Sequence, residues 1–182
     1  MELKQNYLDL CKRYDEEKEE IEIIDVFRSL YDVDDSKLID IAWLFRRLST
    51  KYIKLYPKVK WLLKKLKKTG YKTYILSNAQ EAFTMPELIK LKLSTYFDGI
   101  MISSYYGIKK PNPEIFRLAL KNFHLTDAVM IGNEYSCDIE PAKKLGLKTI
   151  YIESNLTFER KEEPDFRKLN AKRLYQAIIR LY

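Results

Sequence analysis

One stretch of the chain, residues 128–138, constrains the fold more than any other: Ala-Val-Met-Ile-Gly-Asn-Glu-Tyr-Ser-Cys-Asp. Its opening apolar run is too short for a helix and predicts a buried strand. Asn133, Glu134 and Asp138 then follow the carboxyl end of that strand, which is where open α/β sheets bind ligands. Their oxygen atoms are the ligands that Mg²⁺ prefers. The alternative interpretation is a solvated polar loop between two core elements.

From residue 57 onward, predicted strands alternate with predicted helices. The strands are expected at 72–76, 99–103, 128–131 and 148–152. The helices are expected to begin near Pro57, Phe83, Pro111, Pro141 and, with Asn170 as its cap, residue 171. This alternation favours a parallel sheet that is covered by helices on both faces.

Residues 1–56 carry a different pattern, with apolar side chains at helical spacing and no strand signal. Three amphipathic helices are expected, with apolar faces that begin at Leu3, Ile23 and Leu38. We therefore predict a helical subdomain over 1–54 and an α/β domain over 55–182. Asp25 falls inside the second helix among core-like neighbours, so we do not interpret it as a catalytic acid.

Composition bounds the classes of partner. The chain has 182 residues, 46% of them hydrophobic, with no apolar run of membrane-spanning length and no signal-like start, so no membrane is expected. Cys11 and Cys137 share no metal spacing, which predicts reduced thiols and a cytoplasmic location. The net charge of +7 is spread over several helices without a binding motif, so no nucleic acid is expected.

Polar residues accompany three places in the predicted α/β region: Ser77 and Asn78, then Lys110, then the acidic loop after residue 132. A hydroxyl, an ammonium group and carboxylates at one sheet edge can hold a phosphate and a divalent cation. The Ser77 hydroxyl and backbone donors would bind phosphate oxygens, and Lys110 would neutralise their charge. Taken singly, Ser77 fits a turn and Lys110 a solvated surface. Their order and spacing together favour the phosphate site.

The order of these motifs resembles the haloacid dehalogenase superfamily of hydrolases. The resemblance is close over 55–155 and loose over 1–54, and it rests on Leu-Tyr-Pro at 55–57, Tyr-Ile-Leu-Ser-Asn at 74–78, Lys-Lys-Pro-Asn-Pro-Glu-Ile-Phe at 109–116 and Ile-Gly-Asn-Glu-Tyr-Ser-Cys-Asp-Ile at 131–139. It implies a three-layer Rossmann-like parallel sheet, a helical cap before it, a small phosphorylated substrate and Mg²⁺ as cofactor.

The resemblance also implies roles for single residues. Ser77, followed by Asn78, matches the family's phosphate-binding position, and Lys110 matches its lysine. Asn133 and Asp138 match the two acidic positions of the metal loop, the first of which is usually Asp. Asn133 carries no charge, which weakens the expected magnesium site. Glu134 is the candidate to compensate for that lost charge, although it lies one residue out of register.

The family's nucleophile, in an Asp-x-Asp motif after the first strand, has no counterpart before residue 55. We therefore expect that this chain lacks that central strand, which in the family lies between those that carry Ser77 and Asn133. The favoured hypothesis is a phosphohydrolase that forms an aspartyl-phosphate and whose nucleophile is encoded upstream. The alternatives are a split protein completed by another chain, or a non-catalytic relic or binding module. A homodimer or a complementing chain is the expected kind of protein partner.

Overall fold

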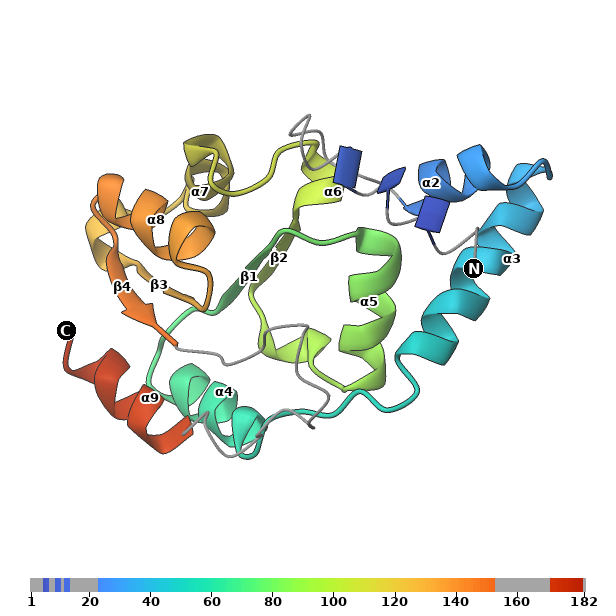
Figure 1. Cartoon of the computed structure of the whole chain (residues 1–182). Coiled ribbons are helices and arrows are strands. Elements are labelled where there is room, and N and C mark those ends of the chain that lie inside the picture. Colours follow the sequence, from blue (N-terminus) through green and yellow to red (C-terminus); the bar gives the residue numbers. More distant parts are fainter. Residues whose placement is uncertain (1–4, 7–8, 11, 14–22, 153–170, 182) are drawn as a thin grey trace. The chain divides into compact units, whose positions relative to one another are not determined.

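The computed structural model describes residues 5–6, 9–10, 12–13, 23–152 and 171–181 (Figure 1). Its regular elements are α2 (Ile23–Leu30), α3 (Asp35–Ser49), α4 (Val59–Lys68), β1 (Tyr74–Ser77), α5 (Glu81–Lys90), β2 (Gly99–Ile102), α6 (Ser103–Tyr106), α7 (Pro113–Ala119), β3 (Val129–Gly132), α8 (Glu140–Lys144), β4 (Lys148–Tyr151) and α9 (Ala171–Ile179). Leu3, Cys11 and the predicted cap Asn170 lie outside the described residues. Within the described residues, no helix is both long and apolar enough to span a bilayer.

The chain divides into two compact units. The first takes the described residues within Met1–Lys54, Leu76–Ser94 and Met101–Lys109, and the second those within Leu55–Ile75, Thr95–Ile100 and Lys110–Tyr182. The first unit therefore contains α5 and α6 besides α2 and α3. A helical cap over 1–54 and a core over 55–182 remain predictions.

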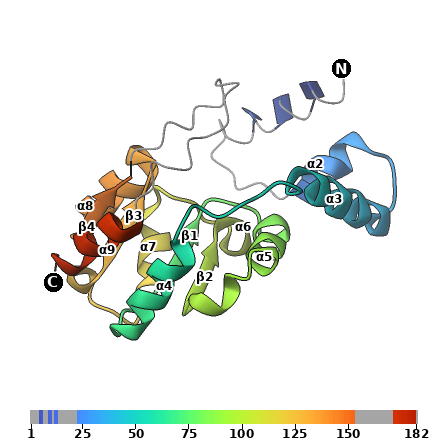
Figure 2. The same cartoon turned by 90° about the horizontal axis from the view of Figure 1, so that it is seen from below.

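An apolar core holds α2 and α3 together in the first unit, and the two helices lie side by side (Figure 2). Val26 and Phe27 of α2 pack with Leu38 and Ala42 of α3, and Phe83 of α5 belongs to the same cluster. On each helix the buried residues share one face, because residues three or four positions apart lie above one another. The second and third predicted helices are confirmed.

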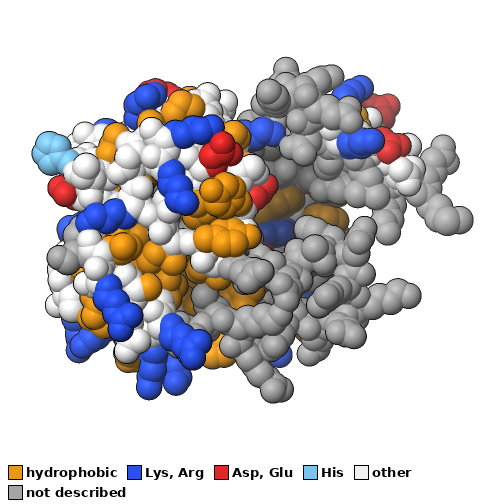
Figure 3. Space-filling view, turned by 60° about the vertical axis from the view of Figure 1, so that its left-hand side comes forward, with side chains coloured by type: hydrophobic (Ala, Val, Ile, Leu, Met, Phe, Trp, Pro, Cys, Tyr) orange, Lys and Arg blue, Asp and Glu red, His pale blue; other side chains and the backbone are white. Residues whose placement is uncertain are grey.

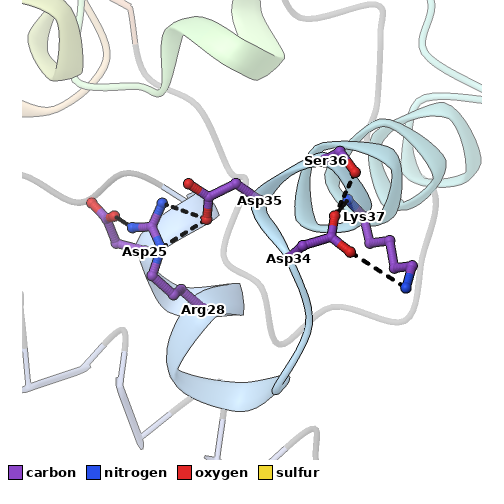
Figure 4. A network of polar contacts seen from close by, with 6 residues as sticks. All are labelled: Asp25, Arg28, Asp34, Asp35, Ser36 and Lys37. Carbon is purple, nitrogen blue, oxygen red and sulfur yellow. Dashed lines mark hydrogen bonds and ion pairs between the residues drawn. The ribbon is translucent and has the colours of Figure 1, made fainter.

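A polar network lies at the corner between α2 and α3 (Figure 4). Asp34 caps α3, and the hydrogen bond from the Ser36 hydroxyl is the main cause that lowers the pKa of its carboxyl group. Arg28 bridges Asp25 of its own helix and Asp35 of α3, and the bond to Asp35 chiefly raises the pKa of the guanidinium. Asp25 is thus an exposed partner in a local ion pair, and its non-catalytic interpretation stays a prediction.

The second unit is built on the parallel pair of β3 and β4, in which Val129 lies opposite Lys148 and Gly132 opposite Tyr151. Helices α4 and α9 lie side by side and pack their apolar faces together (Figures 1 and 2). Leu66 of α4 and Ile178 of α9 belong to the same core as Ile131 of β3. The apolar faces of α4 and α9 thus close over the core side of β3.

The four described strands pair as β1 with β2 and β3 with β4. The predicted alternation of strands and helices is confirmed, whereas the predicted single sheet is found as two hydrogen-bonded pairs within the described residues. A strand in the middle of a sheet bonds along both edges, so each strand of a pair has one edge that no other described strand occupies.

Two predicted helices differ from the structure at their ends. Helix α4 begins at Val59 instead of Pro57, because Lys58 adopts a left-handed backbone conformation with φ of 64°. Helix α7 begins at Pro113, where the Asn112 side chain accepts a hydrogen bond from the backbone N–H of Glu114 at 2.9 Å. It ends at Ala119, whereas the sequence predicts a helix that runs to about Phe123.

Candidate functional site

A buried ion pair joins Lys110, in the turn before α7, to Asp138, in the loop that follows β3. Lys110 Nζ donates to Asp138 Oδ1 at 2.5 Å, and the two side chains are 9% and 7% exposed. The other carboxylate oxygen, Oδ2, accepts from the backbone N–H groups of Asn133 and Glu134, each at 3.1 Å. Asp138 therefore gathers one ammonium and two amide donors, which fixes the path of the loop.

A wide turn brings Asp138 back to the end of its own strand. Residues Tyr135–Ile139 form a π-helical turn that leads into α8, and the Asp138 N–H donates to the Glu134 carbonyl at 2.7 Å. A Cβ on Gly132 would lie 2.3 Å from both Cβ and Oδ2 of Asp138, so this close approach requires glycine at 132. Single π-helical turns are frequent at functional sites.

Four of the predicted site residues come together in the second unit: Lys110, Asn133, Glu134 and Asp138. Asn133 and Glu134 expose their side chains while their backbone groups hold the buried Asp138. Ser77 and Asn78 belong to the first unit, and the convergence of both groups on one phosphate stays a prediction.

In the first unit, Ser77 is the last residue of β1 and Asn78 lies in the turn that leads to α5. This turn is tied to the start of α6. The Ser103 hydroxyl accepts from the Ala79 N–H at 3.0 Å and donates to the Ala79 carbonyl at 3.2 Å. The sequence interpretation missed Ser103, although a polar residue at the end of a predicted strand is the signal that selected Ser77.

Mg²⁺ needs a nearly octahedral set of oxygen ligands. Among the described residues, no group of three or more His, Cys, Asp or Glu side chains could hold a metal ion. The oxygens of Asp138 already accept from Lys110 and two amides, and Asn133 is uncharged. The described residues therefore do not complete a magnesium site by themselves.

Cys137 lies in the same turn, partly buried, and it carries a testable chemical signature. Burial raises the pKa of the thiol, and the hydrogen bond and charge of Glu134 raise it further. A raised pKa lowers the thiolate fraction, so Cys137 is expected to react with iodoacetamide at about pH 8 several-fold more slowly in folded than in urea-unfolded protein. Glu134→Gln should speed the folded-state reaction. Timed alkylation read by peptide mass spectrometry measures both rates, and equal rates in folded and unfolded protein would contradict the expectation.

Basic side chains lie at several separate places among apolar and uncharged ones on the face drawn in Figure 3. The expectation of no nucleic-acid partner rests on the spread of basic residues along the sequence, and it remains a prediction. Cytoplasmic location likewise remains a prediction.

Comparison with known proteins places this geometry in a family context. The family model described as haloacid dehalogenase-like hydrolase matches residues 4–152. The glyceraldehyde 3-phosphate phosphatase of Pyrococcus furiosus is 35% identical over 121 residues, which cover 63% of this chain and 50% of that protein. The phosphoserine phosphatase of Thermus thermophilus is 29% identical over 131 residues, with 70% and 52% covered. The chain spans about half the length of the curated relatives it matches.

Solved structures extend the likeness over more of the chain. A HAD phosphatase from Thermococcus onnurineus superposes with a TM-score of 0.63 at 23% identity, over 84% of this chain and 68% of that one. A HAD hydrolase from Bacillus subtilis, solved with magnesium, gives 0.64 at 21% identity, over 98% and 81%. At these identities the likeness concerns the fold alone, and it confirms the predicted α/β fold.

Proposed function

Because the chain belongs to the haloacid dehalogenase-like hydrolases, as its motifs predicted, we propose that it serves the hydrolysis of a small phosphorylated metabolite. The observation that carries this proposal is the buried Lys110–Asp138 pair, held by two backbone amides in the loop after β3. The substrate class is supported by the matched relatives, which are named as phosphatases of glyceraldehyde 3-phosphate and phosphoserine.

The proposed roles follow from the chemistry of each group. The Ser77 hydroxyl and the backbone amides of its turn bind phosphate oxygens, with Asn78 beside them. The Lys110 ammonium offsets the charge that develops on the transferred group, and a cation acts more strongly where water is excluded. Asp138 orients Lys110 through the 2.5 Å hydrogen bond. Asn133, Glu134 and Asp138 remain the proposed magnesium loop, which needs further ligands from outside the described residues.

The attacking carboxylate is proposed to come from a strand outside this sequence. Its oxygen attacks phosphorus, and the P–O bond to the leaving group breaks as that oxygen takes a proton from water. A second water then cleaves the aspartyl-phosphate, which releases inorganic phosphate and restores the carboxylate. Support comes from the strand pairing, since β1 and β3 each have an edge without a partner strand among the described residues. Such an edge accepts a strand from the same gene product or from a complementing chain.

The test compares phosphatase activity of this chain with that of a version extended by the reading frame upstream of Met1. The substrate is an aryl phosphate, followed by glyceraldehyde 3-phosphate and phosphoserine, with Mg²⁺ or with a chelator. We expect activity in the extended form only, and a loss of about 10²-fold on Ser77→Ala, the scale for one lost oxyanion donor. Ser29→Ala, which removes a hydroxyl that donates to the Val26 carbonyl within α2, is the matched control.

The other outcomes are equally informative. Activity in neither form would favour a relic or binding module, a reading that the uncharged Asn133 also supports. Activity in this chain alone would mean that its own carboxylates, at 25, 134 and 138, include the nucleophile.

A further inference from the structure

Two serines at the start of α6, Ser103 and Ser104, form hydrogen bonds with backbone groups of the turn between β1 and α5. The turn cannot satisfy these groups by itself. Ala79 lies in the middle of this turn and has no polar side chain. Its N–H donates to the Ser103 hydroxyl at 3.0 Å, and its carbonyl accepts from that hydroxyl at 3.2 Å and from the Ser104 N–H at 3.3 Å. Both backbone groups of Ala79 are thus held by residues 24 or 25 positions later in the chain.

Ser104 completes the attachment at the first residue of α5. The Glu81 N–H is one of the amides that a helix start leaves without an intrahelical partner. The N-cap residue Gln80 makes no side-chain cap bond, and the Ser104 hydroxyl accepts from Glu81 at 2.9 Å instead. A helix start capped from a distant segment cannot shift without moving that segment.

Burial makes the Ser103 contact costly to lose. The Ser103 side chain is fully buried, whereas Ser77 is half-buried and Asn78 is exposed. A buried hydroxyl that both donates and accepts fixes its partner in one orientation. If either hydrogen bond is lost, a donor or an acceptor stays inside the protein without a partner, and this carries a desolvation penalty. The turn can therefore expose Ser77 and Asn78 to a ligand while its backbone stays in one conformation.

We propose that Ser103 and Ser104 are positioning residues for phosphate recognition by Ser77 and Asn78. This inference rests on the proposed function, in which that turn binds phosphate oxygens. Ser103 acts through Ala79 and not on the ligand. Hydrogen bonds to phosphate require donors that are positioned to within a fraction of an ångström. Greater freedom of the Ala79 backbone therefore weakens phosphate binding even in a variant that folds.

The test is a titration of this chain with inorganic phosphate, followed by the NMR amide signals of residues 77–79. In the wild-type protein these signals should move on titration. Ser103→Ala should raise the dissociation constant about tenfold, the upper end of one net hydrogen bond. It should also speed hydrogen exchange at the Ala79 amide. Ser29→Ala, whose hydroxyl bonds Val26 within α2, should change neither quantity.

A second pair of variants keeps the proposal testable where Ser103→Ala fails to fold. Ser104 is only partly buried, so Ser104→Ala should fold, weaken phosphate binding and speed exchange at the Glu81 amide. Ser104→Thr retains the hydroxyl and should restore both. A purely structural role would leave the phosphate affinity of the folded variants unchanged.

The outcomes separate this inference from the function on which it rests. Wild-type binding with unchanged affinity in Ser103→Ala and Ser104→Ala would overturn the positioning role and leave the phosphate site intact. No phosphate-induced movement of the 77–79 signals in the wild-type protein would overturn the assignment of this turn to phosphate, and the positioning role with it.

Discussion

Asp138→Ala is expected to lower the free energy of unfolding by about 3–5 kcal/mol, the range for removing one partner of a buried ion pair. The change takes the carboxylate away from Lys110 Nζ and from the backbone N–H groups of Asn133 and Glu134. Lys110 is buried, so its ammonium cannot regain hydration without opening the loop. The site and the stability of the second unit thus depend on the same carboxylate.

Urea unfolding measures this loss, and fluorescence can restrict the signal to the second unit. Trp43 and Trp61 are the two tryptophans of the chain, so a Trp43→Phe background leaves Trp61 of α4 as reporter. Adding Lys110→Met to Asp138→Ala should recover part of the stability, since no buried ammonium then remains. Glu134→Gln changes an exposed carboxylate of the same loop and should stay within about 0.5 kcal/mol. Wild-type stability in Asp138→Ala would contradict the importance of the pair.

The sequence predicted the order of elements better than their ends, and the region before β1 shows why. The strand was expected over 72–76 but begins at Tyr74. Asp98 engages the two residues before it, accepting from Lys72 Nζ at 3.2 Å and from the Thr73 N–H at 2.9 Å. The bond from Thr73 is also the main cause that lowers the pKa of the Asp98 carboxyl group. This hydrogen bond depends on a residue 25 positions away, so the local periodicity of the sequence cannot predict it.

In the candidate site, the sequence predicted which residues belong to the site but not which of them contact one another. Motif order selected Lys110 and Asp138, yet it assigned one to phosphate and the other to metal. The structure joins them through a hydrogen bond across 28 positions of sequence. The π-helical turn that makes this contact has no periodic signature, since one wide turn is too short to repeat. Ser103 was missed because, unlike Ser77, it lies in none of the motifs whose order selected the site residues, and a serine at a strand end taken singly fits an ordinary turn.

Gly132→Ala is expected to cost about 3 kcal/mol, the upper end for overpacking a buried position. The added Cβ would lie 2.3 Å from Asp138 Cβ, an atom that is bonded to the backbone and cannot rotate away. The whole turn of residues 135–139 must move instead, and Asp138 Oδ1 then leaves its place beside Lys110 Nζ. The unfolding assay in the Trp43→Phe background measures the cost.

Two further variants identify the source of that cost. In an Asp138→Gly background the added methyl group meets no carboxylate side chain, so Gly132→Ala should cost less than half as much. Gly70→Ala is the opposite control, because a Cβ there meets no atom within 4 Å and only the φ of +85° resists substitution, at about 1 kcal/mol. An equal cost of Gly132→Ala in both backgrounds would exclude the clash with Asp138 as its cause. Strong non-additivity would instead show that the glycine, the wide turn and the ion pair form one structural unit, which the short motif encodes through a residue with no side chain.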